Sequence, residues 1–329
     1  MKKLLLFSLI LVLVSALVFA GGRGVAAGRP ITITMANPSN PDDNCVRAFF
    51  HFAELVEQRS NGRIQVTVMH SGQLGAHRDY MEQMQMGSLE MAEVNVAVLS
   101  AFDPKFMVFD LPYVSRSVQH LQGLLDGGLA REFSESLESR TGVKILGWMI
   151  RSPRNMYIST RPVRTAADFS GMRVRIMESP VMRRTFELLG AVPVPIAATE
   201  RYMALQTRVV DAAENSIPLI ITQREYEVTR YLSRTEHFIS PNIIAISSRF
   251  FNSLPADLQQ ILIQAGDEAG RYATRLDSET EEAAIHELVR RGMVFNDIPD
   301  KSSFVNMVRP IYTEFRSQIG GDLIDAFTR

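Results

Sequence analysis

Hydrophobic positions along the first part of the chain switch between a period of two and a helical period. Residues 31–35 and 63–69 alternate apolar and polar side chains, which is typical of strands. Residues 44–59 between them carry apolar side chains at helical spacing, and Asn61-Gly62 follows as a helix ending. A strand, a helix and a strand within about 40 residues predict a βαβ unit and so a parallel sheet.

The alternation of helices and strands continues along the chain. It predicts helices over 76–87, 117–140, 165–170, 179–189 and 199–207, and strands over 89–94, 143–150, 155–160, 172–177 and 209–213. A second α/β unit therefore begins after residue 151, and the chain has no internal repeat or low-complexity tract.

Residues 255–292 contain no helix breaker except Gly266 and Gly270. A helix of about 38 residues is roughly 57 Å long at 1.5 Å per residue, longer than one small domain is wide. We therefore expect it to brace two lobes. Lobe I is predicted to comprise 30–151 plus 241–280 and lobe II 152–240 plus 281–329, with hinge motion near 151–152 and 239–241. The predicted fold is α/β, with a ligand cleft between the lobes.

The N-terminus has the pattern of a secretory signal peptide. Lys2 and Lys3 precede an apolar run from 4 to 20, which ends in the small-residue site before Gly21. The alternative is a membrane anchor, but 17 apolar residues are few for a span and no basic cluster follows them. We expect cleavage near Ala20 and a periplasmic mature protein. Cys45 is the only cysteine, which excludes an internal disulfide.

Charge and motif content exclude several functions. The 35 Lys and Arg residues balance 36 Asp and Glu, so a nucleic-acid partner, which needs a basic face, is not expected. The mature sequence lacks the GxSxG, HExxH, GxGxxG, GxxxxGK[ST] and CxxC motifs, and its six histidines lack metal-ligand spacing. We therefore expect no enzyme, no metal and no cofactor.

The predicted strand 172–177 carries the most informative charges. Arg173 and Arg175 share one of its faces, whereas Met172 and Val174 lie on the other. Because a buried unpaired charge is very costly, an Arg in such a strand needs a partner. That partner is either a nearby carboxylate such as Glu178, or a ligand carboxylate held by the guanidinium fork.

A second polar group follows the predicted helix 199–207. Asp211 is interpreted as a turn or cap residue and Glu214 as structural rather than ligand-binding. Asn215 has a donor and an acceptor on one short side chain, which suits a carboxylate or a hydroxyl group.

The chain resembles the solute-binding subunits of tripartite ATP-independent periplasmic (TRAP) transporters. Seven segments carry the resemblance, in the family's order: FAELVEQRSNGRI (52–64), SGQLGAHRD (71–79), VFDLPYV (108–114), TAADFSGMRVRI (165–176), LGAVPVPI (189–196), RYMALQTRVVDAAEN (201–215) and YEVTRYLSRTEH (226–237). The resemblance implies a two-lobed periplasmic-binding-protein fold (type II-like). It also implies a small organic acid ligand and TRAP membrane subunits as partners. We expect a monomer.

The resemblance also implies binding residues. The family's carboxylate-clamping Arg falls on Arg175, the Asn that ends its D-x-x-E-N motif on Asn215, and a further Arg on Arg154, whose alternative role is a hinge salt bridge or a surface charge. The first-lobe contacts vary more within the family. They fall on Asn37, His77 and Asn95, and each of these is nearly as consistent with an ordinary polar residue.

Departures from the family pattern narrow the range of ligands that we expect. Arg208 stands where the family usually has Gly, and the acidic residues of the sialic-acid branch are absent near His77 and Asn95. The second departure disfavours sialic acid as the ligand. The segments RIMESP (175–180), DAAENS (211–216) and SPRNMY (152–157) resemble members that bind sugar acids, such as uronates or aldonates, for delivery to a TRAP permease. C4-dicarboxylates or 2-oxo acids are the alternative ligands. Presentation of the ligand to a membrane sensor and a cryptic hydrolase activity are the alternative functions.

Overall fold

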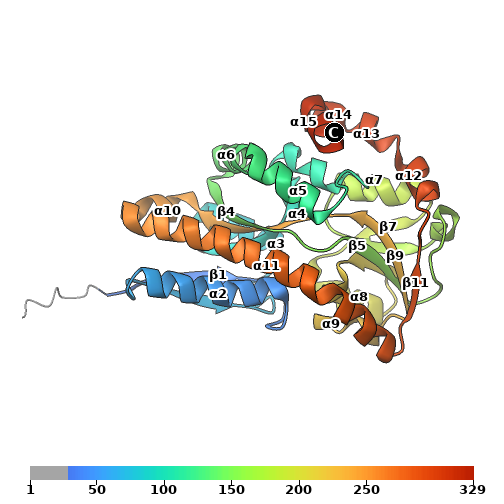
Figure 1. Cartoon of the computed structure of the whole chain (residues 1–329), viewed down its shortest axis with the longest axis horizontal. Helices are drawn as coiled ribbons and strands as arrows, with labels where there is room; N and C mark the ends of the chain where they lie inside the picture. Colours follow the sequence, from blue (N-terminus) through green and yellow to red (C-terminus); the bar gives the residue numbers. More distant parts are fainter. Residues whose placement is uncertain (1–28) are drawn as a thin grey trace, which may run out of the picture.

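Two mixed β-sheets, each covered by helices, make up the computed structural model, which describes residues 29–329 (Figure 1). The predicted signal peptide, 1–20, and its cleavage site near Ala20 lie outside the described residues. The first sheet has the order β2-β1-β3-β10-β4. Its strands are β2 (Ile64–Met69), β1 (Ile31–Ala36), β3 (Met91–Asn95), β10 (Asn242–Ser247) and β4 (Val143–Met149).

The second sheet has six strands in the order β11-β9-β5-β8-β6-β7. They are β11 (Val294–Asp297), β9 (Tyr231–Phe238), β5 (Arg154–Ile158), β8 (Ala212–Asn215), β6 (Arg173–Ile176) and β7 (Val192–Pro195). The predicted α/β class with two lobes is confirmed by these two sheets and their helices.

Helices lie in all the segments where the sequence pattern predicts them. The α-helices are α2 (Asn44–Arg59), α3 (His77–Met86), α4 (Val96–Leu99), α5 (Val118–Leu124), α6 (Ala130–Thr141), α7 (Pro180–Leu188), α8 (Arg201–Gln206), α9 (Ile217–Thr222), α10 (Ser248–Ser253), α11 (Ala256–Arg290), α12 (Ser302–Val308), α13 (Ile311–Glu314), α14 (Arg316–Ile319) and α15 (Gly321–Thr328). Of these, α4, α9, α10 and α12–α15 are additional helices that the pattern did not predict. Short turns of other helix types are η1 (Pro104–Asp110), η2 (Leu125–Leu129), η3 (Ala166–Phe169), η4 (Ala198–Glu200) and η5 (Glu225–Glu227). No helix within residues 29–329 is both long and apolar enough to cross a membrane.

The prediction of a parallel sheet is only partly right. β1 pairs in parallel with β2 and β3, and β6 with β7 and β8, as βαβ connections require. β10 and β5, however, are antiparallel to both of their neighbours. Each of these two strands follows a crossing between the sheets, from β9 to β10 and from β4 to β5. Each of these strands therefore enters its new sheet at the edge where the neighbouring strands end, and it runs in the opposite direction to them.

Two predicted elements differ from the structure for local reasons. Residues 117–140 do not form one continuous helix, because Gly128 takes a φ of 117° and separates α5 from α6. The predicted strand 209–213 instead begins at Ala212. Arg208 adopts a φ of 57°, in the left-handed region that favours glycine, so the chain is still turning where the pattern suggested a strand.

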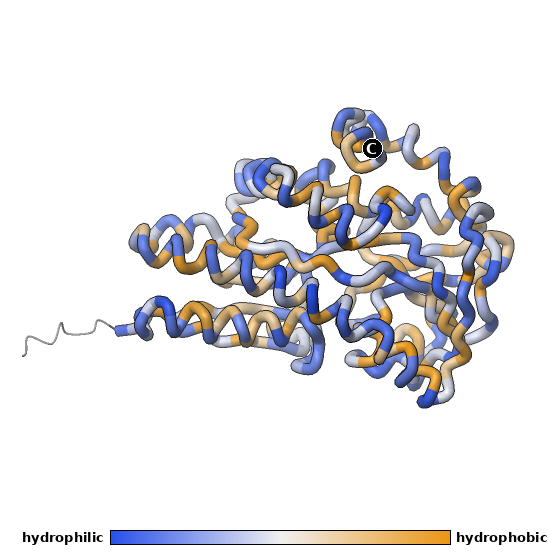
Figure 2. The backbone as a smooth tube through the Cα atoms, viewed as in Figure 1, coloured by the Kyte–Doolittle hydropathy of each residue, from blue (hydrophilic) through white to orange (hydrophobic). Residues whose placement is uncertain are grey.

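Helix α11 spans both parts of the molecule, as its predicted length required. Its 35 residues correspond to a rod of about 52 Å, and Figure 1 shows it running diagonally from the first sheet toward the strands of the second. It packs on α2 and β4 in the first part and on α9 in the second. Hydrophilic and hydrophobic residues alternate along it in Figure 2, as expected when only part of a helix surface is buried.

The two glycines of α11 allow the helix to approach β4 closely. A Cβ atom on Gly266 would lie 2.6 Å from the Cβ of Leu146, and one on Gly270 would lie 2.5 Å from the backbone oxygen of Trp148. Gly147 faces the same contact from the strand side, where a Cβ would lie 2.1 Å from the oxygen of Gly266. These glycines are therefore packing residues, and the helix continues through both.

The C-terminal helices return to the first sheet after α12 has packed on the second. Phe304 and Val308 of α12 are buried with the core of the second sheet. In contrast, the buried side chains of α13–α15 belong to the cluster of the first sheet, namely Ile311, Ile319, Ile324 and Phe327. The lobe boundaries remain a prediction.

The close contact between α11 and β4 predicts opposite effects for two glycine substitutions. Gly266→Ala should lower the free energy of unfolding by about 1–3 kcal/mol, because the added methyl group overlaps Leu146. Gly123→Ala, in α5 with open space around it, should instead raise it by about 0.5–1 kcal/mol through helix propensity. Chemical denaturation of both variants checks this, and equal stability of Gly266→Ala and wild type would contradict the packing role.

Candidate carboxylate-binding pocket

A polar pocket lies between the two sheets, beside the ends of β3 and β8. The empty space among its lining residues, with the solvent at its open mouth included, is about 420 Å³. Residues from both parts of the chain line it, among them Ser39, His77, Asn95, Arg154, Arg201 and Asn215. We call this the central pocket. An adjoining pocket of about 320 Å³ is lined by Arg175 and shares His77, Met177 and Ala198 with it.

Arg175 is buried in β6 without a charged partner among the described residues. Its Nε donates to the backbone oxygen of Ile196 at 2.8 Å, while Nη1 and Nη2 are buried and have no acceptor within residues 29–329. Burial, and then the cation of Arg201, lower the pKa of Arg175 to about 9. The guanidinium therefore presents two donor groups and a charge that no carboxylate within residues 29–329 pairs with directly.

The alternative internal partner of Arg175 is ruled out by the position of Glu178. The Glu178 carboxylate accepts from Nε of Arg78 in α3 at 2.8 Å, on the surface. Arg173, the other arginine of the strand, is exposed and forms an ion pair with Asp211 at 2.7 Å. Asp211 therefore has a structural contact, but with a neighbouring strand and not as the predicted turn or cap residue.

Asn215 and Arg154 are brought together at the paired ends of β8 and β5. Oδ1 of Asn215 accepts from Nη1 of Arg154 at 3.0 Å and from the Ser216 amide at 2.9 Å. Nδ2 of Asn215 has no protein acceptor within residues 29–329, so it is left as a donor at the pocket wall. Arg154 itself forms a buried ion pair with Glu214, as the structural interpretation of Glu214 predicted. Arg154 thus orients Asn215, and its fork is largely occupied.

His77 begins α3 and is the first-lobe residue shared by both pockets. Burial lowers the pKa of His77 to about 4, so the ring is neutral near pH 7. Its Nδ1 lies 3.3 Å from the backbone oxygen of Glu93, which can only accept. Nδ1 therefore carries the proton, and Nε2 retains a lone pair that can accept from a ligand hydroxyl group.

The other two predicted first-lobe residues are bound up in internal contacts. Oδ1 of Asn37 accepts from the Ser39 amide at 2.8 Å, and its Nδ2 is buried without a partner within residues 29–329. Asn95 lines the central pocket, caps α4 through Ala97 at 2.9 Å, and donates to Asn242 at 2.5 Å. As binding residues, Asn37 and Asn95 stay predictions.

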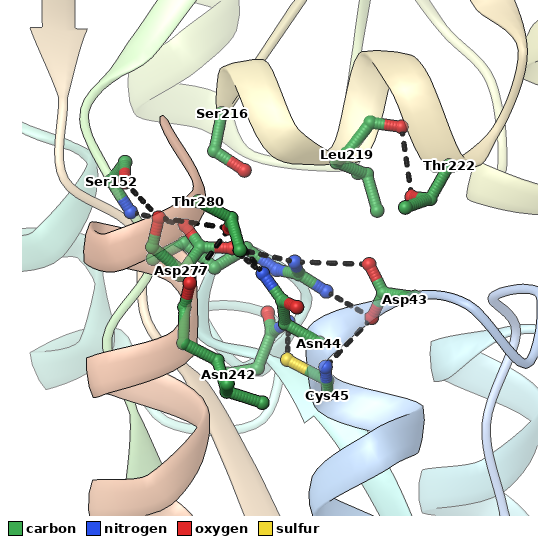
Figure 3. Close-up of polar contacts among 12 residues, drawn as sticks. Asp43, Asn44, Cys45, Ser152, Ser216, Leu219, Thr222, Asn242, Asp277 and Thr280 are labelled. Atoms are coloured by element: carbon green, nitrogen blue, oxygen red, sulfur yellow. Dashed lines mark hydrogen bonds and ion pairs between the residues drawn. The ribbon is translucent and has the colours of Figure 1, made fainter. Parts of the chain in front are cut away.

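A cluster around Arg151 closes the base of the pocket at the crossing from β4 to β5. The Arg151 fork contacts Asp43 at 2.9 and 3.2 Å and lies 3.5 Å from Asp277 of α11. Asp277 also accepts from the Ser152 amide at 2.6 Å, and Asn44 bonds both Asp277 and Thr280 (Figure 3). The start of α2, the middle of α11 and the crossing strand are therefore held by one buried network.

Glu93 connects this cluster to the pocket wall. It lines the central pocket, lies 3.7 Å from Arg151 and accepts from Asn242. Burial, only partly offset by Arg151, raises the pKa of Glu93 to about 7. Glu93 therefore takes up a proton at a higher pH than an exposed carboxyl group does.

The structure adds Arg201 to the arginines that the sequence singled out. It is buried at the start of α8, lines the central pocket, and donates from Nε to Glu225 at 2.5 Å. Its sequence signal is a charged residue at the first position of an otherwise amphipathic helix, which also suits an exposed residue. Only the pairing with Glu225 of η5, 24 residues away, identifies it as buried.

The residues of the pocket do not form a metal centre. Within residues 29–329 there is no group of three or more His, Cys, Asp or Glu side chains that could hold a metal ion. The arrangement instead provides guanidinium and amide donors for an anion, together with neutral groups suited to hydroxyl oxygens.

Comparison with known proteins agrees with this chemistry. The family described as bacterial extracellular solute-binding protein, family 7, matches residues 35–318. The chain belongs to this family. A solute-binding protein of Sulfitobacter sp. strain NAS-14.1 is 31% identical over 278 residues, which are 84% of each chain. The resemblance to TRAP solute-binding subunits is confirmed.

Two solved structures share the fold of this family 7 protein. A TRAP periplasmic solute-binding protein from Sulfitobacter sp. NAS-14.1, with bound β-D-galacturonate, has a TM-score of 0.86 and 29% identity. It covers 90% of this chain and 99% of its own. The sugar-acid-binding protein of Advenella mimigardefordensis strain DPN7T, in complex with galactonate, has a TM-score of 0.88 and 26% identity over 91% and 97% of the two chains.

The two parts of this family 7 protein touch across the pocket mouth. Asn40, in the loop after β1, donates to the backbone oxygen of Thr222 at 3.2 Å, and Arg78 pairs with Glu178. Gly72 lies so close to Thr199 that a Cβ would come within 2.7 Å of its methyl carbon. The lobes are therefore closed on one another around the central pocket.

The buried neutral state of His77 predicts a pH effect on stability. Between pH 4 and 6.5 the unfolded chain binds the proton that folded His77 rejects, so this residue makes stability rise with pH across that window. From pH 4.5 to 6.5 wild type should gain about 2 kcal/mol more unfolding free energy than His77→Gln. His286→Gln, at an exposed site on α11, is the control and should track wild type. Equal pH dependence of all three proteins would contradict a buried neutral His77.

Proposed function

We propose that this protein captures a sugar acid in the periplasm and delivers it to the membrane subunits of a TRAP transporter. The carboxylate is held in the second lobe by Arg175 and Asn215, and Arg154 positions Asn215. Hydroxyl groups of the ligand meet the first lobe, where His77 accepts and Asn95 forms part of the wall. Asn37 is buried outside the lining and supports it by accepting from the amide of the lining residue Ser39.

The observation that carries this proposal is the uncompensated guanidinium of Arg175. A buried cation without a partner costs several kcal/mol in real proteins, so a folded chain retains one only where something compensates it. A ligand carboxylate does so with two parallel hydrogen bonds from Nη1 and Nη2, which have no acceptor in the described part of the chain. Nδ2 of Asn215 supplies a further donor.

The neutral groups of the pocket support a polyhydroxylated acid over a simple fatty or aromatic acid. His77, Asn95, Ser39 and Gln223 line the central pocket with donors and acceptors that carry no charge near pH 7. The proteins solved with galacturonate and galactonate share this fold over nearly their whole length. A uronate or aldonate fits both observations.

The remaining parts of the proposal concern the state of the mature protein. Cleavage near Ala20 releases the chain into the periplasm, and the protein acts there as a monomer without catalysing a reaction. The residues of the pocket support the absence of catalysis. Arg154 and Arg201 are in ion pairs, Arg175 is free to bind a carboxylate, and His77 is neutral near pH 7. No arrangement of nucleophile, base and acid is formed by its described lining residues.

Removal of the Arg175 charge should abolish tight binding and leave the fold intact. Arg175→Met keeps much of the side-chain volume and should weaken binding of the cognate acid by roughly 30- to several-thousand-fold, equivalent to about 2–5 kcal/mol. Arg173→Met, on the same strand but exposed, should bind as wild type does. Isothermal titration of residues 21–329 with uronates and aldonates measures both, after a thermal-shift screen that includes matched neutral sugars.

Two outcomes of that titration would count against the proposal. Equal affinity of wild type and Arg175→Met for the same acid would remove the clamp. Binding of the neutral sugars as tightly as their acids would show that the carboxylate is not what the pocket recognises.

A further inference from the structure

We propose that the pocket selects monocarboxylates against dicarboxylates, and that Arg201, neutralised by Glu225, is the specificity-determining residue that binds an uncharged oxygen of the ligand. This inference rests on the proposed function and adds the charge class of the ligand. It commits the site to acids with one carboxylate and a hydroxyl or carbonyl oxygen beyond it.

Arg201 is placed to contact the ligand and is held rigidly. It lies at the start of α8, it is buried, and it lines the central pocket. Its Nε donates to Oε1 of Glu225 at 2.5 Å, and no protein group within residues 29–329 accepts from its Nη atoms. The Arg201 fork therefore has donors left for the ligand.

The charge of Arg201 is already compensated. Burial alone would lower its pKa, but the carboxylate of Glu225 raises the pKa of Arg201 above its ordinary value, as a close buried ion pair does. Glu225 is itself buried, so water screens its charge only weakly. A ligand carboxylate at Arg201 would thus face a pair with no net charge, and would lie near a second carboxylate.

The other arginines of the central pocket follow the same rule. Arg154 is paired with Glu214, and Arg151 has Asp43, Asp277 and Glu93 around it. Among the arginines that line the central pocket and the adjoining pocket, only Arg175 has no carboxylate of the described residues within ion-pair distance. The walls therefore offer one uncompensated positive charge, which one carboxylate neutralises, while a second would remain as a buried unpaired anion.

Neutral groups beside Arg201 fit an uncharged oxygen. Gln223 lines the same pocket, and its Nε2 is buried without an acceptor within residues 29–329. Together with the Nη atoms of Arg201 it provides donors for a hydroxyl or carbonyl oxygen, which needs hydrogen bonds but no countercharge. A site built to hydrogen-bond such an oxygen discriminates strongly against ligands that cannot satisfy it.

The test compares two ligands that differ at one end. Galactonate carries one carboxylate, and galactarate keeps its secondary hydroxyl groups but has a second carboxylate in place of the terminal CH2OH group. The matched pair gluconate and glucarate serves as a second comparison. Wild type should bind the monoanion at least about tenfold more tightly than the dianion in calorimetric titrations at pH 7.5. Equal or tighter binding of the dianion would overturn the inference.

A charge change at Glu225 tests the assigned residue. Glu225→Gln keeps an acceptor for Arg201 but removes the compensating charge, so the preference for the monoanion should shrink by about tenfold or more. Glu227→Gln, two residues along the same turn and exposed, should leave the preference unchanged. An unchanged preference in folded Glu225→Gln would show that Glu225 does not set the selection.

The outcomes separate this inference from the proposed function. One outcome is that neither member of either pair binds to the folded, ligand-free wild-type protein, and that no other uronate or aldonate in the thermal-shift screen binds to it. The proposed function then fails, and the inference fails with it. If both members bind with similar affinity, carboxylate capture stands and only the charge selection is wrong. The comparison in wild type decides this even if Glu225→Gln does not fold.

Discussion

The buried guanidinium of Arg151 joins three elements whose relative positions determine where the two sheets meet. Asp43 lies immediately before α2, Asp277 lies in the middle of α11, and Arg151 itself lies on the strand that crosses from the first sheet to the second. Loss of one member of such a network leaves charges buried without a partner, which typically costs about 3–5 kcal/mol. The network therefore fixes where the two sheets meet, and the pocket is the space left between them.

Compensation of charge explains how so many arginines surround one small pocket. Arg154 with Glu214 and Arg201 with Glu225 are neutral pairs that orient donors without adding charge. Arg175 differs because its only described hydrogen bond goes to a backbone oxygen. In the proposed function, the cost of desolvating the ligand carboxylate is offset at Arg175. This residue lies on β6 of the second sheet, facing the part of the chain that contains the first sheet.

Closure and rigidity are supplied by different parts of the chain. The glycine contacts between α11 and β4 bind the long helix tightly to the first sheet, whereas its other end packs on α9 beside the pocket. The contacts across the mouth, such as Arg78 with Glu178, are exposed and each contributes little by itself. A ligand that bridges both walls can therefore shift the balance toward the closed form by its own contacts.

Local chemistry in the sequence determined much of this protein. The helical period of 44–59, the short helical segment at 165–170, and the long segment broken only by Gly266 and Gly270 each appear in the structure as the pattern indicated. The strand pattern placed Arg173 and Arg175 on one face. It did not show that Arg173 is exposed and Arg175 is buried. The family motifs added the identity of the chain and the prediction that Arg175 clamps the ligand carboxylate.

Tertiary structure decided the pairings. Glu214 is 60 residues from Arg154, and Asp43 is 108 residues from Arg151, so no periodicity in the sequence relates them. The antiparallel entry of β5 and β10 likewise follows from two crossings between sheets and has no local signature. An arginine pairs with a neighbouring residue, or remains able to bind a ligand, according to which carboxylates the fold brings within a few ångströms of it. Charge compensation acts through space, so only the folded chain sets those distances.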